Sequence, residues 1–239
     1  MPASRSPLQR MFASVPRRYD AVNRLTTFGL DRRWRERAIA EILSFAPARA
    51  LDLCTGTGDL AVGLAEACPV GTSITAVDFS LPMLGEAVRK ASACGAASRI
   101  AFALADAASL PFSSGTFGVV GIGFGLRNLT WRNARSGAHL AEILRVLRPG
   151  GHLVAAESSQ PRAAAVRLGF RAYLRAVVGP IGGLVSGNRG AYAYLAESAA
   201  RFYSDAELEG VLEEAGFCRV RHTPLLAGVA AIHVAEKPA

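Results

Sequence analysis

Paired cysteines and metal-ligand clusters are missing from this chain of 239 residues. It has only four cysteines, with no C-x-x-C pair, and four histidines without the spacing of metal ligands. These absences argue against a disulfide framework and against a bound metal. Unpaired thiols of this kind favour a reducing, cytoplasmic location.

Long apolar runs are also missing. The most apolar stretch, Ala176 to Val185, is ten residues long and is interrupted by glycines and by Pro180. A transmembrane helix needs about 20 residues. With 51% apolar residues, the chain can nevertheless bury a substantial core. We expect a flexible tail over residues 1–10 and a single domain over 11–239, which begins with a helical cap over 11–46.

Lysine is scarce, since arginine supplies 25 of the 27 basic residues, and the net charge is +8. Residues 1–40 alone carry nine arginines against three acidic residues. This pattern fits a nucleic-acid-binding face, a surface that visits anionic lipid, or a coding bias toward arginine. The acid-free start, residues 1–18, superficially resembles a transit peptide, but folded-type sequence begins near Phe12, so we expect none.

The most informative segment is Leu51-Asp52-Leu53-Cys54-Thr55-Gly56-Thr57-Gly58-Asp59-Leu60. In it, an apolar run with one embedded carboxylate ends in Gly-x-Gly, and a helix-like pattern follows. Asp78, with Phe79 behind it, closes the next apolar run twenty residues after Gly58. Strand, glycine turn, helix, strand and acid in this order predict a nucleotide-type cofactor site at the carboxyl ends of a parallel sheet.

Asp52 narrows the kind of cofactor. The Gly-x-Gly turn alone is also compatible with an ordinary tight turn. A carboxylate at the end of the first strand suits a ligand with a charged amino group, whereas it would repel the pyrophosphate of a dinucleotide. The segment therefore resembles motif I of Rossmann-like S-adenosylmethionine (SAM) methyltransferases, in which Asp78 would bind the ribose hydroxyls.

Strand and helix patterns alternate along the chain and predict an α/β fold, with a mostly parallel sheet covered by helices on both faces. Seven strands are expected, at 49–54, 73–78, 99–104, 117–123, 150–157, 217–224 and 229–236. Helices are expected at 58–68, 81–93, 131–147 and 204–215, after N-terminal helices that break near residues 26–29 and resume with Asp31 as N-cap. An aromatic-rich helical insertion over 158–203 would form a lid over a bulky apolar substrate, or pack as ordinary helices.

Polar residues also follow the third and fourth strands. In a SAM site Asp106 would accept a hydrogen bond from the adenine amino group and Ala107 would offer its backbone amide, although Asp106 alone fits an Asx-turn. The fourth strand ends at Gly123, and Arg127 and Asn128 follow, where a methyltransferase places groups that face the transferred methyl. Either can bind an oxygen that becomes negative, while Arg127 could instead pair with a neighbouring carboxylate.

Several strings taken together are similar to the ubiquinone/menaquinone biosynthesis C-methyltransferases, over residues 11–237. They are Tyr19-Asp20-Ala21-Val22-Asn23, Phe28-Gly29-Leu30 with Trp34-Arg35, Gly56-Thr57-Gly58-Asp59, Leu110-Pro111-Phe112, Phe124-Gly125-Leu126-Arg127-Asn128, Arg145-Val146-Leu147-Arg148-Pro149-Gly150-Gly151, Tyr192-Ala193-Tyr194-Leu195-Ala196-Glu197-Ser198 and Ala215-Gly216-Phe217. The strings around Arg127 and Tyr194 are specific to that family, whereas Gly-Thr-Gly and Pro-Gly-Gly are common to many methyltransferases.

The resemblance implies a class I, Rossmann-like methyltransferase whose sheet ends in an antiparallel hairpin. It implies SAM-dependent methylation of a ring carbon of a polyprenylated quinol, foremost demethylmenaquinol and otherwise the ubiquinone-pathway benzoquinol. It assigns cofactor contacts to Thr57, Asp78, Asp106 and Ala107. Together with the residues of the glycine turn and the strand ends, the expected cofactor-binding residues are Asp52, Gly56, Thr57, Gly58, Asp78, Phe79, Asp106, Ala107 and Gly123. No metal is implied, and the choice between monomer and homodimer stays open.

The roles of the acceptor-side residues follow from the chemistry of the implied reaction. A ring carbon is a poor nucleophile until the adjacent phenol, with a pKa of about 10, loses its proton. Arg127 is our candidate for stabilising the phenolate, with Asn128 and Tyr194 orienting the ring. The chain departs from the family at Gly123, where a serine that contacts the cofactor is usual, and at Ser158, where phenylalanine is usual.

Three other functions compete. The departures at Gly123 and Ser158 motivate a tailoring C- or O-methyltransferase that acts on a small phenol or quinone. A non-catalytic binding module is disfavoured because the acids and glycines of the cofactor site are all present. An RNA-modifying enzyme is disfavoured because the Pro-Pro-aromatic clamp is absent, so we expect no nucleic-acid partner. For a prenylated substrate, the basic N-terminal segment would hold the enzyme near anionic lipid.

Overall fold

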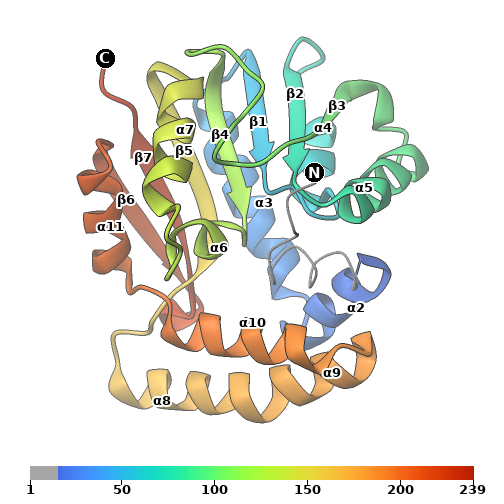
Figure 1. Ribbon diagram of the computed structural model, residues 1–239, viewed down its shortest axis with the longest axis vertical. Coiled ribbons are helices and arrows are strands. Elements are labelled where there is room, and N and C mark those ends of the chain that lie inside the picture. The colour runs from blue at the N-terminus through green and yellow to red at the C-terminus, as the bar shows by residue number, and fades with distance from the viewer. Residues whose placement is uncertain (1–15) are drawn as a thin grey trace, which may run out of the picture.

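The computed structural model describes residues 16–239, apart from the side chain of Arg17 (Figure 1). A seven-stranded sheet in the order β3-β2-β1-β4-β5-β7-β6 lies at its centre. The first five strands in this order are parallel, whereas β7 is antiparallel to both β5 and β6. The strands are β1 Arg49–Leu53, β2 Ser73–Asp78, β3 Ile100–Leu104, β4 Phe117–Gly123, β5 Leu147–Ser158, β6 Cys218–Leu225 and β7 Ala230–Glu236. The predicted mostly parallel sheet with an antiparallel edge pair is confirmed.

Helices cover both faces of this sheet. They are α2 Pro16–Thr26, α3 Leu30–Ser44, α4 Asp59–Ala67, α5 Leu81–Ala93, α6 Leu126–Thr130, α7 Ser136–Val146, α8 Ala164–Tyr173, α9 Gly179–Ser186, α10 Arg189–Arg201 and α11 Asp205–Glu214, with short turns η1 Ala97–Arg99, η2 Leu174–Val178 and η3 Leu226–Gly228. One core cluster joins the sheet to α3, α4 and α5, and a second joins its other face to α6, α7 and α11. The central strands β1 and β4 are almost wholly buried, because both of their faces are covered.

The carboxyl edge of the parallel strands faces α2 and the helical insertion (Figure 1). In this view α8 and α9 form the outermost layer at the bottom, and α10 lies between them and the sheet. Tyr173 ties the insertion to the cap, since its hydroxyl donates a hydrogen bond to the Thr26 carbonyl at 2.7 Å. Among residues 16–239, no helix is long and apolar enough to cross a membrane.

The helices α8 and α9 follow each other through the π-turn η2, without a loop between them. Pro180 explains the π-turn, because a proline within a helix removes one backbone donor and crowds the preceding turn. Gly182 lets α10 approach α9 closely, since a Cβ at this position would lie only 2.2 Å from the Tyr192 ring. The buried Tyr192 ring therefore packs directly on the backbone of α9.

The two ends of the insertion meet at one hydrogen bond. Ser159 follows β5, and Asp205 is the first residue of α11. The Ser159 hydroxyl donates to Asp205 Oδ1 at 2.5 Å, and both side chains are buried. The segment between β5 and α11 therefore begins and ends at one place.

Three local predictions are wrong. The helix predicted over 131–147 begins only at Ser136, because Asn133 closes an Asx-turn: its Oδ1 accepts from the Arg135 amide at 2.9 Å. Asp31 is not an N-cap, since Gly29 precedes α3 and Asp31 lies in the first turn, where it accepts from the Thr27 hydroxyl. Strand β5 begins at Leu147 rather than at residue 150, with a register shift in its pairing to β4. The predicted tail over 1–10 lies outside the described residues.

Candidate active site

The turn after β1 brings open backbone to the N-terminus of α4. Gly56 and Gly58 have φ angles of 55° and 84°, a region that glycine enters without steric cost. A Cβ at Gly58 would lie 2.8 Å from the Ala87 Cβ, so this glycine is needed for packing against α5. A Cβ at Gly56 would meet only the Cys54 carbonyl, at 4.0 Å. Gly56 therefore leaves room for a ligand to approach the main chain.

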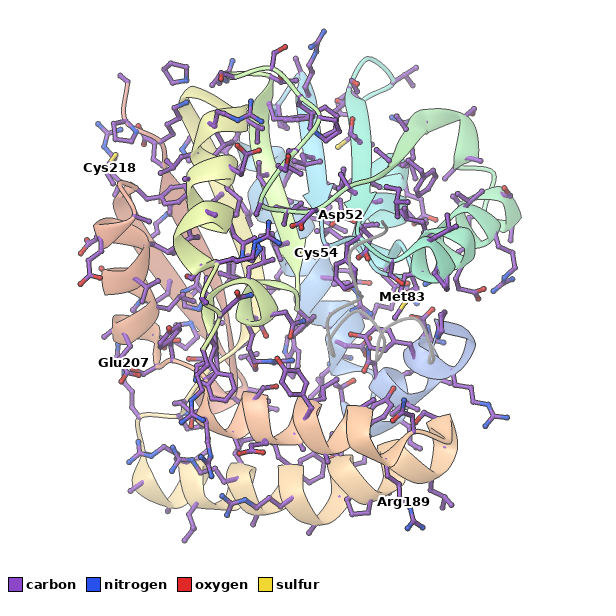
Figure 2. All side chains as sticks on the ribbon, viewed as in Figure 1. Asp52, Cys54, Met83, Arg189, Glu207 and Cys218 are labelled. Atoms are coloured by element: carbon purple, nitrogen blue, oxygen red, sulfur yellow. The ribbon has the colours of Figure 1, made fainter. Side chains whose placement is uncertain are left out.

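Asp52 is fully buried at the base of this turn. Figure 2 shows it next to Cys54, at the end of β1 and deep within the molecule. Its Oδ2 accepts a hydrogen bond from the Thr55 hydroxyl at 2.5 Å, while Oδ1 has no hydrogen-bond partner among the described residues. Burial raises the pKa of Asp52 to about 7, although the Thr55 hydroxyl and the Ala61 amide lower it in part. The carboxyl group therefore changes its protonation state near neutral pH.

Asp78 and Asp106 end the next two strand–loop units. Asp78 is buried and accepts from the amides of Gly56, at 2.9 Å, and Ser80, at 2.8 Å. Burial raises the pKa of Asp78, and these amides offset part of the increase. Asp106 is half-buried and accepts from the Ala108 amide and the Arg135 guanidinium, which hold its pKa below the usual value although burial acts in the opposite direction. Both carboxylates are thus fixed in place by backbone amides.

The electrostatic environment of the turn is negative. Burial raises the pKa of the Cys54 thiol well above its usual value, and the charges of Asp78, Asp52, Asp106 and Glu157 raise it further. Four carboxylates therefore act on one buried point. Such a site suits a cationic ligand and disfavours a pyrophosphate. These residues fit SAM, which carries a sulfonium and an ammonium group.

Two other predicted cofactor contacts lie at the same edge, and a third is engaged elsewhere. Phe79 is half-buried directly after Asp78, and Ala107 is buried directly after Asp106. The Thr57 hydroxyl, in contrast, donates to Asp20 of α2 at 2.6 Å. Lys90 of α5 forms ion pairs with Asp20, at 2.6 Å, and with Asp59 at the start of α4. Thr57 therefore joins the cofactor turn to the N-terminal cap.

Arg127 is held in a fixed position on the other side of the edge. It is buried, and its Nη1 donates to Glu157 Oε1 at 3.1 Å and to the Ser158 hydroxyl at 2.6 Å. Glu157 is fully buried and also accepts from the backbone amide of Arg127 at 3.0 Å. The pairing with a carboxylate, which the sequence left open, is thus present. The Nε of Arg127 has no partner among residues 16–239, and its predicted role toward a phenolate stays a prediction.

Three further predicted residues lie near Arg127 or at the end of β4. Asn128 follows directly in α6, and its Oδ1 is buried without a hydrogen-bond partner in the described part of the chain. Tyr194 of α10 is half-buried, and although burial raises the pKa of its phenol, the charge of Arg127 lowers it in part. The insertion therefore places Tyr194 within electrostatic range of Arg127. Gly123 is half-buried, with the Arg35 side chain and Leu60 nearby.

Two residues of this site were not predicted as such. Tyr19 of α2 lies close enough to Arg127, Arg35 and Glu157 for their charges to affect its pKa, which burial raises. Glu157 anchors Arg127. Tyr19 stands in one of the strings that indicated the family, and Glu157 precedes a departure from it, so both were visible. The sequence gives no sign, however, that either side chain points toward Arg127.

The strand order and the acids at the ends of β1, β2 and the loop after β3 define a Rossmann-like methyltransferase fold. A SAM-dependent methyltransferase from Aquifex aeolicus superposes with a TM-score of 0.56 at 19% identity, covering 79% of this chain and 80% of that one. The YcgJ protein from Bacillus subtilis superposes with a TM-score of 0.58 at 15% identity, covering 85% of this chain and 99% of that one. These similarities establish the fold.

The family follows from sequence. The profile of the ubiE/COQ5 methyltransferase family matches residues 2–237, and the chain belongs to this family. It is 47% identical over 228 residues to a demethylmenaquinone methyltransferase from Thermus thermophilus, covering 95% of this chain and 100% of that protein. A demethylmenaquinone methyltransferase from Deinococcus radiodurans is 42% identical, with coverage of 96% and 92%. The ubiquinone/menaquinone biosynthesis C-methyltransferase UbiE from Geotalea uraniireducens is 37% identical, with 96% of both chains covered.

Proposed function

We propose that this chain transfers the methyl group of SAM to a ring carbon of a prenylated quinol, with demethylmenaquinol as its acceptor. The names of the Thermus thermophilus and Deinococcus radiodurans relatives support this acceptor. The structural observation that carries the proposal is that two consecutive residues of α6 each hold a buried polar atom without a partner among the described residues. These atoms are Arg127 Nε, a donor, and Asn128 Oδ1, an acceptor. A quinol oxygen and a quinol hydroxyl would satisfy them.

The cofactor side of the site would be held by Asp52, Gly56, Asp78 and Asp106. SAM bound there supplies an electrophilic methyl group on a cationic sulfur. Backbone amides hold both carboxylate oxygens of Asp78 in place, and such a fixed acceptor suits the ribose hydroxyls. Gly56 offers open backbone, and the unpartnered Oδ1 of Asp52 offers an anionic acceptor above a pH of about 7.

Arg127 has the properties needed to stabilise a phenolate. Its charge is balanced by the fully buried Glu157, so the pair together is neutral. This arrangement leaves Nε as a fixed hydrogen-bond donor in a site from which water is largely excluded, where such donors stabilise a developing negative charge most strongly. Asn128 and Tyr194 would hold the ring in register. Once the phenol proton has passed to solvent water, the ring carbon next to the phenolate oxygen would bond to the methyl carbon as the carbon–sulfur bond of SAM breaks, with S-adenosylhomocysteine as the leaving group. The ring carbon would then lose its own proton to solvent water, and aromaticity would return.

Positioning of the quinol ring would supply much of the remaining rate acceleration. Helices α2 and α10 lie over the carboxyl edge of the sheet (Figure 1). They would hold the quinol ring in a fixed orientation against the methyl donor. Correct alignment of two reactants is worth about 7–11 kcal/mol of the barrier. Tyr19 and Tyr194 come from these two helices and both lie within electrostatic range of Arg127.

Product analysis tests the proposal. The purified chain is incubated with methyl-labelled SAM and, separately, with chemically reduced prenylated naphthoquinol, prenylated benzoquinol and unprenylated naphthoquinol. We expect a carbon-bound methyl group on the prenylated naphthoquinol, identified by NMR. A methyl group on oxygen, or transfer only to the unprenylated ring, would instead support the tailoring enzyme. No observation in the structure favours that alternative, and the relatives named above are quinone-biosynthesis enzymes.

A prenylated acceptor resides in a bilayer, so the chain would work at a membrane surface. The basic N-terminal segment was our expected contact, but residues 1–15 lie outside the described part of the chain. The cytoplasmic location stays a prediction, and the choice between monomer and homodimer stays open.

A further inference from the structure

The outer side of the insertion carries an apolar stripe where a solvent-exposed helix normally carries polar residues. Every fourth residue along α8, η2 and α9 is exposed and apolar, and these residues are Leu168, Ala172, Ala176, Pro180 and Leu184. Leu168 is 72% and Leu184 is 76% exposed. A repeat of four, longer than the 3.6 of an α-helix, matches the π-turn η2 in the middle. The stripe extends over roughly 24 Å.

The α2–α3 turn adds a second apolar element to this surface. Phe28 is 80% exposed and has a φ angle of 53°, an uncommon conformation for an aromatic residue. Its ring lies 6.3 Å from the ring of Tyr173, the last residue of α8. Leu25, one turn earlier in α2, is 52% exposed. Half of the ten large apolar side chains that are exposed in residues 16–239 belong to the end of α2, to this turn and to α8 and α9.

Charge around the stripe has one sign only. Residues 158–196 contain five arginines and no acidic residue. Arg167 and Arg171 fold back onto the Pro161 carbonyl and the Gln160 side chain. Arg175 and Arg189, in contrast, are exposed and have no ion-pair partner in the described part of the chain. Figure 2 shows Arg189 projecting outward from the lower edge of the molecule.

We propose that this surface, the outer stripe together with Phe28 and Leu25, is the face by which the chain docks on an anionic lipid bilayer. An apolar helical face flanked by arginines, and free of acids, is the pattern of a helix that lies in the interface of a membrane. The inference rests on the proposed function for its purpose, because a prenylated quinol has to be taken from the bilayer. It places the contact on the insertion, rather than on the N-terminal segment alone.

A second copy of the chain fits the surface less well. A two-fold interface brings the same patch of both subunits together. Here it would set arginines against arginines, and residues 158–196 offer no carboxylate to pair with them. A nucleic acid would use the arginines but would leave the apolar stripe unexplained.

Vesicle binding tests the inference. The full chain is sedimented with vesicles of phosphatidylglycerol and phosphatidylcholine, and with vesicles of phosphatidylcholine alone. We expect binding to the first that weakens at high salt, and a loss of at least tenfold in binding for the double variant Leu168→Glu/Leu184→Glu. Both residues are exposed, so these changes leave the fold intact. The control is Val70→Glu, which adds one such negative charge away from the stripe, at a side chain that is 90% exposed on the loop between α4 and β2.

Two activity assays separate this inference from the proposed function. With a short-chain quinol in solution, the double variant should match the wild-type chain. With a long-chain quinol in anionic vesicles, its rate should fall at least tenfold. Wild-type chain that fails to bind anionic vesicles, or a double variant that binds as tightly as Val70→Glu, would overturn the docking face. So would a dimer in analytical ultracentrifugation that only the double variant disrupts. Vesicle binding without transfer to any quinol would retain the docking face and reject the proposed function.

Discussion

The carboxylate of Glu157 holds both the main chain and the side chain of Arg127. Oε2 accepts from the Arg127 amide at 3.0 Å, and Oε1 accepts from Nη1 at 3.1 Å. Glu157 is the last residue but one of β5, and Arg127 is the second residue of the short helix α6. Two elements 30 residues apart are thereby joined at the point where a substrate would lie.

Breaking this pair should affect stability and activity differently. Arg127→Met leaves the Glu157 charge buried and unpaired, and Glu157→Gln leaves the Arg127 charge buried and unpaired. Each should lower the free energy of unfolding by about 3–5 kcal/mol, while the double variant should lose less than the sum, since no buried charge remains. Urea unfolding measures these values.

The double variant Arg127→Met/Glu157→Gln should regain stability relative to the single variants, but it should not regain activity. Loss of the guanidinium should lower kcat by about 100-fold or more, as for other single donors that stabilise an oxyanion. The double variant should therefore be folded and nearly inactive. If Arg127→Met methylates a short-chain quinol at the wild-type rate, the assignment of Arg127 to the phenolate is wrong.

SAM binding should depend on pH through Asp52. In the free protein, burial raises the pKa of Asp52 to about 7, whereas a nearby ammonium group favours the carboxylate. SAM binding should then release a proton below pH 7, and SAM affinity should rise by up to tenfold per pH unit between pH 5 and 7. Calorimetry in buffers of different ionisation enthalpy measures this proton.

Asp52→Asn should abolish both the proton release and the pH dependence. Asp106→Asn is the control: the pKa of Asp106 lies below its usual value, so this carboxyl stays ionised across the same range. In the folded state Asp52 keeps its proton to higher pH than in the unfolded chain. The wild-type chain should therefore lose stability relative to Asp52→Asn as pH rises from about 4 to 7. A constant stability difference would contradict the raised pKa.

Gly123→Ser should restore a cofactor contact that is usual in the family. A Cβ at this position would lie 3.8 Å from the Leu60 Cβ and 3.9 Å from the Arg35 side chain, which are ordinary contacts. One added hydrogen bond of about 1 kcal/mol should tighten SAM binding roughly fivefold. Gly123→Ala adds the carbon without the hydroxyl and should leave the affinity unchanged. Equal effects of alanine and serine would exclude the hydrogen bond.

Two tyrosines of α10 should differ in what the loss of the hydroxyl group changes. The Tyr192 hydroxyl is buried without a partner among residues 16–239, so Tyr192→Phe should keep or raise stability, by about 1 kcal/mol. Tyr194→Phe should instead raise the KM for the quinol about tenfold, since it removes a hydrogen bond to substrate, with SAM affinity unchanged. Kinetics on a short-chain quinol and thermal unfolding compare the two; a raised KM in Tyr192→Phe alone would reverse the assignment.

The sheet and its carboxyl edge were predicted well, because the residue patterns that indicate them are short and contiguous in the sequence. Apolar runs that end in Asp52, Asp78 and the loop at Asp106 mark strand ends directly. Parallel pairing then brings these ends together without further information. Helix boundaries near Asp31 and Asn133 were missed because short polar side chains there bond to neighbours in a way that either a helix or a turn allows.

The contacts around Arg127 and Thr57 could not be predicted, because they join distant segments. Thr57 and Asp20 are 37 residues apart. The residues around them do not indicate that the Thr57 hydroxyl points toward α2. The apolar stripe on α8 and α9 was hidden for another reason. Its repeat of four residues depends on the π-turn. The sequence pattern therefore does not match the 3.6-residue period by which an apolar helix face is recognised.

The hydrogen bond between Ser159 and Asp205 has a consequence for how this fold can diversify. The insertion begins and ends at one point, so its length and sequence can change while the strands on either side keep their register. Replacing residues 160–204 with the corresponding segment of another methyltransferase would exchange Tyr194 and the rest of the lid, and leave Arg127, Asn128 and the three acids of the cofactor site in place. The part of the proposed acceptor site that the insertion supplies can then be exchanged, whereas the proposed site of the methyl donor is built by the sheet.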